Sequence, residues 1–420
     1  MFDVIVATDP REAYQPQDTL TLWWLADPAN PQRVGTLRLV LSSQSVGFQY
    51  ARSWLATGGI ALSEDLPLRD DLFIPARKGE VIGAIDDARP DRWGERVIRR
   101  FEKTQRLSLL EYLLFAGEDR HGALGVSVRA DAYVPWPSAP IASLADLDEM
   151  AQVIRKVLTN EPVPDIQRRL IRAGVSLGGA RPKSLVSING EPWLVKFGEG
   201  EETDTELIEH ASMTLAARCG IDVATTRALP VLRRHAVAVR RFDRIGARRV
   251  HALSAFVVLR AAGEAHGYPQ LAQLLRRLAP AREIVSQQEQ LFRRMVFNIL
   301  IDNTDDHEKN HVLLRGLDGQ YLLAPAFDVL PSAMGLGVQA MQVGSAGSDS
   351  TIENALSQAA AFGLRLPRAK AVAKDVAHTV ETWKDHFRSA GVMPVDIERL
   401  TPYIDGRHLG RERAAILGAR

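Results

Sequence analysis

The stretch NTDDHEKN at positions 303–310 follows an apolar helical pattern and directly precedes the strand-like run HVLLRG. Phosphoryl transfer needs a carboxylate that orients the attacking hydroxyl and accepts its proton, and a nearby amide oxygen that holds a metal ion on the phosphates. Asp305 and Asn310 have the D-x-x-x-x-N spacing that protein kinases use for these roles, whereas Asp306 does not. Asp305 is therefore the predicted catalytic residue. The alternative is a polar turn that only caps the helix.

A further carboxylate stands at the end of an apolar run that predicts a strand. The run YLLAPAFDVLPS places Asp328 after this strand and shortly before a proline. In kinases an aspartate at this point in the chain order holds Mg²⁺ against the phosphates. We therefore expect Asn310 and Asp328 to be metal ligands, although a lone acidic residue at a strand end is more often part of a turn.

A lysine inside an apolar run is the candidate for contacting the nucleotide. Lys196 lies in WLVKF, so its stem would be buried while its ammonium group reaches an α- or β-phosphate. A buried lysine needs an acidic partner. Glu209, on the helix expected next, is the predicted partner, and Glu206, one turn earlier, is the alternative.

The stretch SLGGARPKS at positions 176–184 predicts a loop whose small residues let backbone N–H groups approach phosphates closely. It is not a Walker A loop, because Pro182 stands where that motif has a glycine. A glycine-rich hairpin without a phosphate role is the alternative. The candidate nucleotide-binding residues in this loop are Ser176, Gly178, Gly179, Ala180 and Lys183.

The elements that must position these groups follow from periodicity. Alternating runs such as TLTLWWL and GTLRLVL, followed by helical patterns such as WGERVIRRFEK, predict a small mixed unit at the N-terminus. The proline-rich segment DAYVPWPSAPIASL interrupts the periodicity and marks a boundary. Asn189-Gly190 between two alternating runs predicts a hairpin, and TELIEHASMTLAARCGI predicts a helix that ends at Gly220.

Beyond about residue 255 the pattern is mainly helical and includes the apolar helix QLFRRMVFNILIDN. The order of elements predicts an α+β chain with three domains. Residues 1–130 form an N-terminal subdomain, residues 131–240 a β-rich nucleotide lobe, and residues 241–420 a helical lobe with the catalytic hairpin. Two-lobed protein kinases are arranged in this way.

Composition limits the partners and the compartment. The chain has 420 residues and a formal net charge of +1, so no global field holds nucleic acid or an anionic membrane. The single cysteine, Cys219, excludes an intrachain disulfide and falls at a predicted core position. The first residues lack a basic region followed by an apolar run, and no stretch of about 18 apolar residues occurs. A cytoplasmic protein is expected.

A dense basic cluster lies in RRFDRIGARR. A solvated strand-and-turn face is one interpretation, and a phosphate-facing or RNA-proximal patch is the other. The sequence does not choose between them. The members of the cluster are Arg240, Arg241, Arg244, Arg248 and Arg249.

Several short motifs in fixed order resemble those of the HipA family, the kinase toxins of bacterial toxin–antitoxin pairs. They extend over almost the whole chain and include GEDRHGAL, SLGGARPKSLV, the WLVKF lysine strand, RRFDR, NTDDHEKNHVLL and LAPAFDVLPS. The resemblance implies a two-lobed, kinase-like (HipA-like) fold with a β-rich N-lobe, an extra N-terminal subdomain and a mainly α-helical C-lobe. It also implies ATP and Mg²⁺ as cofactors.

Matched by position, the resemblance makes residues 176–183 the phosphate loop and Ser176 an autophosphorylation site. Lys196 would hold ATP, Asp305 would be the catalytic aspartate, and Asn310 and Asp328 would bind the metal. His307, which family members share, is counted with the nucleotide site, where it is expected to orient the loop of Asp305. These roles are what the resemblance implies.

The implied partners are a small helix-turn-helix antitoxin, HipB-like, and a protein substrate. For studied members the substrate is an aminoacyl-tRNA synthetase, and a glutamyl-type enzyme is expected here. DNA would be reached only through the antitoxin, and no membrane partner is expected. Two alternatives stay open: a small-molecule phosphotransferase, which shares the D-x-x-x-x-N arrangement, and a kinase-fold binding protein that acts mainly through its antitoxin.

Overall fold

The computed structural model describes residues 14–174, 177 and 179–418. The chain divides into two compact units: unit 1 comprises Met1–Leu194 with Arg244–His251, and unit 2 comprises Val195–Asp243 with Ala252–Arg420. The division falls inside strand β7 (Glu191–Phe197). The domain boundaries expected at residues 130 and 240 stay predictions.

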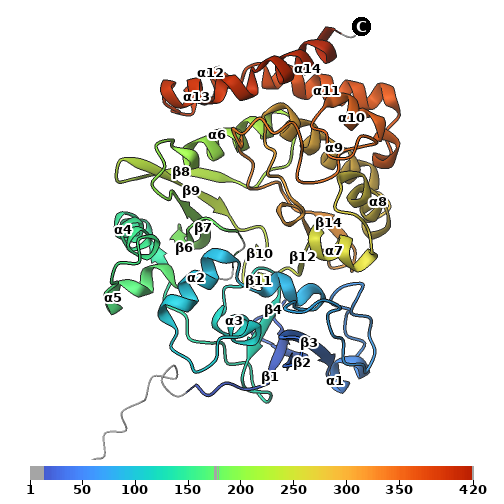
Figure 1. The fold of residues 1–420 in the computed structure, drawn as a ribbon. Coiled ribbons are helices and arrows are strands. Elements are labelled where there is room, and N and C mark those ends of the chain that lie inside the picture. Colours follow the sequence, from blue (N-terminus) through green and yellow to red (C-terminus); the bar gives the residue numbers. More distant parts are fainter. Residues whose placement is uncertain (1–13, 175–176, 178, 419–420) are drawn as a thin grey trace, which may run out of the picture. The chain divides into compact units, whose positions relative to one another are not determined.

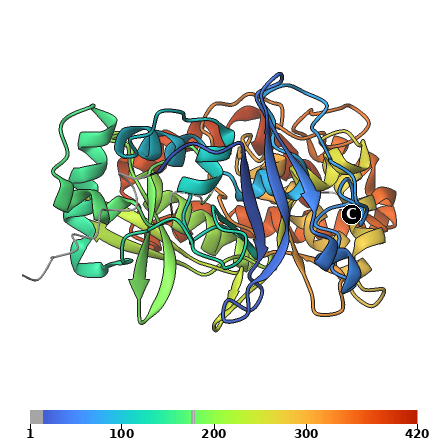
Figure 2. The same cartoon turned by 90° about the horizontal axis from the view of Figure 1, so that it is seen from below.

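Unit 1 contains a four-stranded antiparallel sheet with the order β3-β2-β1-β4, whose blue strands lie side by side in Figure 2. Leu37 of β2 faces Phe48 of β3, and both side chains are fully buried. The strand predictions for TLTLWWL and GTLRLVL are confirmed. The strands are β1 (Thr19–Trp24), β2 (Gln32–Val40), β3 (Ser45–Tyr50) and β4 (Leu124–Ser127).

Unit 1 also contains several short helices, which follow one another along the chain. Ser108 and Glu111 form a capping box that starts α3, which fixes where this buried helix begins. The α-helices are α1 (Arg52–Ala56), α2 (Arg92–Phe101), α3 (Leu109–Phe115), α4 (Leu147–Leu158) and α5 (Asp165–Arg168). The 3₁₀ turns are η1 (Gly83–Ala88), η2 (Leu144–Asp146) and η3 (Arg169–Ile171).

A hairpin turn between β6 and β7 forms where the sequence predicts it. Asn189 and Gly190 have φ angles of 54° and 79°. A two-residue turn of type I′ requires positive φ at both positions, which asparagine and glycine tolerate best. Strand β6 (Lys183–Ile188) also pairs in parallel with the short strand β5 (Ala142–Ser143).

In unit 2, helix α6 (Thr205–Arg218) packs on the antiparallel strands β8 (Thr226–Val231) and β9 (Arg234–Arg240). Helix α6 precedes Gly220, whose φ of 73° provides the left-handed stop that the sequence predicts. Cys219 is buried, as expected, and burial raises the pKa of its thiol to about 12.

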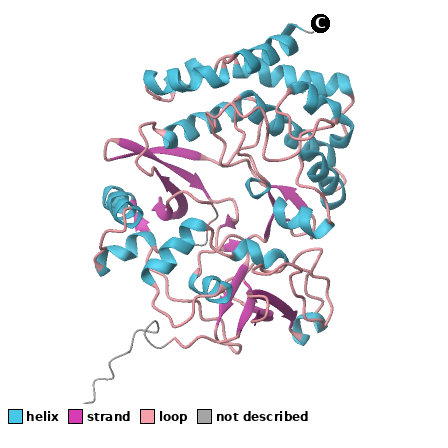
Figure 3. Cartoon of the chain, in the orientation of Figure 1, coloured by secondary structure: helices cyan, strands magenta, loops and turns pink. Residues whose placement is uncertain are grey.

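The rest of unit 2 is mainly helical, as the cyan segments of Figure 3 show. A small antiparallel sheet of β12 (Ala252–Ser254), β13 (Val312–Arg315) and β14 (Tyr321–Leu323) interrupts the helices. The elements between β12 and β13 are α7 (Ala255–Ala262), α8 (Tyr268–Leu278), α9 (Ile284–Leu300) and the 3₁₀ turn η4 (Glu308–Asn310).

Helix α9 is the centre of the helical packing, because α8, α10, α11 and α14 all contact it (Figure 1). Its side chains from Leu291 to Leu300 are almost all buried. The elements after the sheet are α10 (Ile352–Ser357), η5 (Ala359–Phe362), α11 (Leu366–Val380), α12 (Trp383–Ser389), α13 (Pro394–Ile404) and α14 (Arg407–Gly418). Among the described residues, no helix is both long and apolar enough to cross a membrane.

Candidate active site

The β13–β14 hairpin determines where the loop 302–310 and Asp328 lie in unit 2. The loop leads into β13, and Asp328 follows β14. The strands are antiparallel, and the N–H of Ala324 donates to the carbonyl oxygen of Val312 at 2.7 Å. The start of one antiparallel strand lies beside the end of its partner. Asn310 and the segment of Asp328 therefore lie at the same end of the hairpin.

The backbone that leads to Asp328 is held by two neighbouring segments. The N–H of Ala326 donates to the carbonyl of Asp222 at 2.8 Å, and Arg294 of α9 donates to the carbonyl of Ala324 at 2.6 Å. Burial lowers the pKa of the Arg294 guanidinium to about 10. Asp328 itself has a φ of 58°, in the left-handed region that residues other than glycine rarely adopt. Its carboxylate therefore starts from a fixed and strained backbone.

Lys196 of β7 brings two carboxylates together. Its ammonium nitrogen Nζ lies 2.7 Å from Glu209 Oε1 and 2.5 Å from Asp328 Oδ1. The side chains of Lys196 and Glu209 are 6% and 3% exposed, whereas that of Asp328 is 32% exposed. The packing of α6 on the sheet brings Glu209 to the lysine. The pair that the sequence favoured, Lys196 with Glu209, is present.

The electrostatics of this cluster keep the lysine charged. Burial by itself would lower the pKa of Lys196, but the carboxylates of Asp328 and Glu209 outweigh it and raise the pKa above its ordinary value. An ammonium group has three hydrogen-bond donors, and these carboxylates accept two of them. Within the described residues no acceptor is found for the third donor, which can bind an anionic oxygen.

The adjacent residues Asp305 and Asp306 have opposite environments. Asp305 is exposed. In the described chain, its backbone N–H donates a hydrogen bond to Ser332 Oγ at 3.2 Å. Asp306 is only 2% exposed. A base must reach the hydroxyl from which it takes a proton. The environment of Asp305 suits this task, and that of Asp306 does not.

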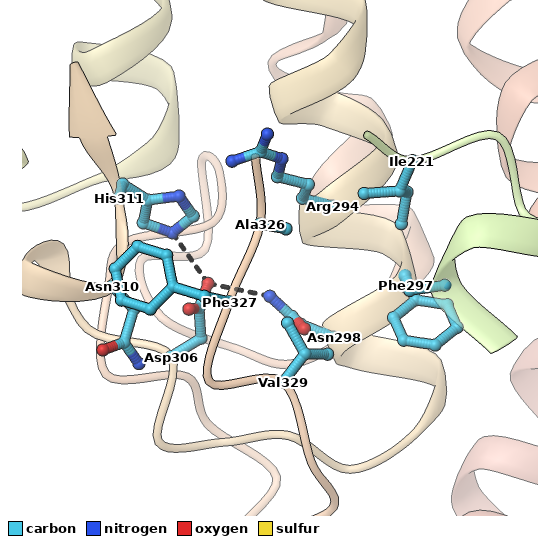
Figure 4. Close-up of a pocket in the computed structure, with 11 residues that line it drawn as sticks. Ile221, Arg294, Phe297, Asn298, Asp306, Asn310, His311, Ala326, Phe327 and Val329 are labelled. Atoms are coloured by element: carbon cyan, nitrogen blue, oxygen red, sulfur yellow. Dashed lines mark hydrogen bonds and ion pairs between the residues drawn. The ribbon is translucent and has the colours of Figure 1, made fainter. Parts of the chain in front are cut away.

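Asp306 is the acceptor at the centre of a buried hydrogen-bond network. Its Oδ2 accepts from Asn298 Nδ2 and His311 Nε2, each at 2.8 Å, as the dashed lines in Figure 4 show, and also from the hydroxyl of Tyr268. Burial would raise the pKa of Asp306, but the charge and hydrogen bond of His311 and the Tyr268 hydroxyl lower it overall. The Asp306 carboxylate therefore holds the loop 302–310 in place through buried hydrogen bonds. Only the polar Asn298 within an apolar helix hinted at this network in the sequence.

Asn310 is the last residue of the 3₁₀ turn η4, and His307 is the residue just before this turn. Asn310 is 8% exposed, and its backbone N–H donates to the carbonyl of His307 at 2.9 Å. Asn310, Phe327 and Val329 line one small cavity, so Asn310 is close to both neighbours of Asp328 (Figure 4). The buried Nδ1 of His307 has no hydrogen-bond partner in the part of the chain that the structure describes.

The glycine-rich loop belongs to unit 1. The predicted residues Ser176 and Gly178 lie outside the described residues. Gly179 has a φ of 106°, and its N–H donates to Asp91 Oδ2 at 2.7 Å. A Cβ atom on Gly179 would lie 2.2 Å from Nζ at the flexible end of Lys183, which could move aside, so it is the positive φ that favours glycine here. Ala180 is exposed.

Much of the basic cluster has structural partners. In unit 1, Arg244 donates to the carbonyls of Arg120 and Gly122 at 2.7 and 3.1 Å. Arg249 donates to the carbonyl and to Oε1 of Glu118 at 2.9 and 3.0 Å. These bonds hold the loop 118–122, which is most of the GEDRHG motif at positions 117–122. In unit 2, Arg241 forms a bidentate pair with Asp243. These contacts favour the structural interpretation for these three arginines, while Arg240 and Arg248 are exposed.

Comparisons with known proteins cover most of the chain. A family model described as the HipA-like C-terminal domain matches residues 175–383, and one described as the HipA N-terminal domain matches residues 28–127. Among solved structures, the chain is similar to one in the complex of the Shewanella oneidensis MR-1 toxin–antitoxin system, HipA and HipB with operator DNA. This match has 17% identity and a TM-score of 0.65, and it covers 96% of this chain and 100% of that chain.

A Helicobacter pylori proinflammatory kinase, CtkA, is also similar, with 14% identity, a TM-score of 0.40, and 58% of this chain and 93% of that chain covered. The likeness to the Shewanella structure concerns the fold. It confirms the HipA-like α+β fold that the sequence predicts.

Proposed function

The chain belongs to the HipA family, whose domain models match both its N-terminal and its C-terminal parts, and on this premise we propose that it is an ATP- and Mg²⁺-dependent serine/threonine protein kinase. One observation carries the proposal: the buried Lys196 pairs with Glu209 and Asp328 in the same unit as the exposed Asp305. This combines a phosphate-binding cation, a candidate metal ligand and a candidate base.

Lys196 binds the nucleotide phosphates in this proposal. Glu209 holds the ammonium group of Lys196 in place. The N–H donor of Lys196 that is bonded to neither Glu209 nor Asp328 binds an α- or β-phosphate oxygen in this proposal. The backbone N–H groups of the loop with Gly179 and Ala180, together with Lys183, provide further donors for the phosphates. Ser176 and Gly178 complete this loop in the sequence.

Asn310 and Asp328 fit a Mg²⁺ ion by the chemistry of their oxygens. Mg²⁺ prefers carboxylate and amide oxygens, and it commonly takes only one or two protein ligands beside water and phosphate oxygens. The hairpin brings both residues to one end, and the carboxylate of Asp328 is partly exposed. When bound, the ion would neutralise charge on the transferred phosphoryl group.

Asp305 acts as the base. Its exposed carboxylate orients the hydroxyl of the substrate serine or threonine and accepts the proton as the oxygen attacks the γ-phosphate. Asp306 and its buried partners keep the loop rigid beneath it. His307 orients the same loop from the position just before η4.

The biological setting is proposed from the family. The chain would be the toxin of a toxin–antitoxin pair, with a small helix-turn-helix antitoxin as partner and DNA reached through that antitoxin. HipA, HipB and operator DNA occur together in the similar Shewanella structure. The net charge of +1 agrees with DNA contact through a partner. The proposed substrate is an aminoacyl-tRNA synthetase, first of all a glutamyl-type enzyme, and the proposed location is the cytoplasm.

The test is to incubate the full chain with γ-labelled ATP, Mg²⁺ and a panel of purified aminoacyl-tRNA synthetases. We expect label on a synthetase with the wild type and none with Asp305→Asn, which should still bind the nucleotide. Transfer within tenfold of wild type in Asp305→Asn would contradict the assignment of the base. Label on small hydroxyl compounds alone would favour the small-molecule phosphotransferase, and antitoxin binding without any transfer would favour the binding protein.

Ser176 is the proposed autophosphorylation site. A phosphate there would carry about −1.5 to −2 charges beside the site for ATP phosphates, and repulsion would weaken ATP binding. Mass spectrometry after incubation with ATP should find phosphate on the Ser176 peptide of the wild type and none on that of Asp305→Asn. An unmodified wild-type peptide would leave Ser176 only a capping role in the loop.

A further inference from the structure

Two loops of unit 2, residues 302–305 and 332–335, are joined beside the candidate base by side-chain to backbone hydrogen bonds of Ser332 and Asp302. We call this set of hydrogen bonds the Ser332–Asp302 tie. The hydroxyl oxygen of Ser332 accepts the backbone N–H groups of both Thr304 and Asp305, at 2.9 and 3.2 Å. In the described part of the chain, no hydrogen bond or ion pair is found for the Asp305 carboxylate itself. The position of that carboxylate is therefore set by its backbone, and Ser332 holds this backbone.

The tie is reciprocal. The backbone N–H of Ser332 donates to the carbonyl of Asp302 at 2.8 Å. The side-chain Oδ2 of Asp302 accepts from the N–H groups of Met334 and Gly335, at 3.3 and 3.1 Å. Each loop thus supplies one side chain that binds the backbone of the other. Because Asp302 is only 5% exposed, these N–H groups are satisfied largely without water.

Backbone strain is concentrated in the same place. Asp302 and Ala333 have φ angles of 57° and 52°, and Asp328, just before the second loop, has 58°. A left-handed conformation is unfavourable for most residues other than glycine, although aspartate tolerates it better than alanine does, and it persists where the surroundings enforce it. Such strain is commonly found at functional sites. The Ser332–Asp302 tie is a local interaction that can enforce it here.

We propose that Ser332 and Asp302 are positioning residues that hold Asp305 at the angle from which its carboxylate meets the acceptor hydroxyl. This inference rests on the proposed function, because it needs Asp305 to be the base. Asp305 projects from a loop rather than from a helix or strand, so its aim depends on the hydrogen bonds of its own N–H and of its neighbour's. Neither positioning residue touches the nucleotide in this scheme.

The tie predicts a specific division of kinetic effects. Ser332→Ala removes the acceptor of two N–H groups without changing a charge. It should lower kcat between about tenfold and a hundredfold, as small misplacements of a catalytic group do. The KM for ATP should change less than about twofold, because a loss confined to the transition state lowers kcat at constant KM. Ser332→Thr keeps the hydroxyl and should restore most of the activity.

The matched control is Ser357→Ala. Ser357 is the last residue of α10 in the same unit, and its hydroxyl also accepts a backbone N–H, that of Ser345 in the turn before this helix, at 2.9 Å. Its loss should leave kcat within about twofold of wild type. Asp302→Asn keeps an acceptor oxygen, and asparagine tolerates the left-handed φ. Asp302→Asn should therefore lower kcat less than Asp302→Ala does.

The experiment measures two quantities on the full chain. Phosphoryl transfer to a glutamyl-type synthetase gives kcat and KM, and hydrogen–deuterium exchange of a peptide spanning residues 302–310 reports the tie itself. In Ser332→Ala we expect faster exchange of this peptide together with the lower kcat, and neither change in Ser357→Ala.

Faster exchange with unchanged kcat would overturn the positioning role, and unchanged exchange would overturn the tie. An equal loss of kcat in Ser332→Thr would also refute the role of the hydroxyl. A wild-type chain that transfers no phosphate to any protein would instead overturn the proposed function and the positioning role with it. The exchange measurement would then still decide whether the tie exists.

Discussion

The contrast between Asp305 and Asp306 gives the sharpest prediction about this site. We compare Asp305→Ala with Asp306→Ala, which remove the same carboxylate from adjacent positions. Asp306→Ala leaves three buried donors, from Tyr268, Asn298 and His311, without their acceptor. Asp305→Ala removes an exposed carboxylate, and the hydrogen bond from Asp305 to Ser332 uses only the backbone N–H.

The magnitudes follow from burial. An unsatisfied buried donor costs about 1–3 kcal/mol, and removing one partner of a buried charged pair costs about 3–5 kcal/mol. The three donors share one network, so their costs do not add, and about 3–5 kcal/mol is the expected loss for Asp306→Ala. For a unit of this size this corresponds to a fall in melting temperature of roughly 6–20 °C. Asp305→Ala should change the stability by less than about 0.5 kcal/mol.

Scanning calorimetry of both variants, paired with phosphoryl transfer measured below the melting temperature of Asp306→Ala, separates the two roles. Asp305→Ala should melt like the wild type and transfer no phosphate. Asp306→Ala should melt early. A variant Asp305→Ala that melts many degrees early, or Asp306→Ala that melts like the wild type, would refute the assignment of base and anchor.

The same network predicts a dependence of stability on pH. The pKa of Asp306 is below its ordinary value of 3.8: burial raises it, but the charge and hydrogen bond of His311 and the Tyr268 hydroxyl lower it further. For a lowered pKa, the stabilising contribution is present above the ordinary pKa and is lost as the pH falls through the lowered one. The difference in melting temperature between wild type and Asp306→Ala should therefore shrink below about pH 4. A constant difference down to pH 2 would contradict the lowered pKa.

Three further predictions concern the rest of the site. Asp328→Ala should abolish the part of ATP affinity that depends on Mg²⁺, because a carboxylate ligand is lost; calorimetric titration with and without Mg²⁺ checks this, and equal affinities in wild type and variant would exclude Asp328 as a ligand. Lys196→Met should lower the melting temperature, because it removes the ammonium group that lies 2.7 Å from the buried Glu209 carboxylate. Adding Glu209→Leu should recover stability but not nucleotide binding, and recovered binding would refute the role of the lysine. Arg249→Ala should speed hydrogen exchange in residues 118–122 without changing ATP affinity, since its bonds go to Glu118; a weaker ATP affinity would show that the arginine serves the nucleotide instead.

Local features of this chain could be predicted because their causes are local. The turn at Asn189-Gly190 follows from the positive φ that these residues tolerate, and the end of α6 follows from Gly220. The strand and helix patterns of unit 1 were likewise visible as periodicity. The family, and with it the fold, could be predicted because short motifs of fixed spacing and order extend over almost the whole sequence.

Contacts between residues far apart in the sequence could not be predicted in the same way. The spacing to Asn310 favoured Asp305 over Asp306, but only packing shows that Asp306 is buried against Tyr268, Asn298 and His311. The arginine cluster left two interpretations open, and the bonds of Arg249 to Glu118 exist only once the chain has folded.

The sequence by itself identified the candidate residues for the proposed chemistry, since residue type and spacing express what phosphoryl transfer requires. The tertiary structure decided which of these groups are exposed, paired or held. The packing of α6 and the β13–β14 hairpin brings Glu209 and Asp328 to Lys196, and the tie of Ser332 to the loop of Asp305 has no motif. The physical reason is that burial and pairing depend on the positions of several segments at once, whereas a motif records only one segment.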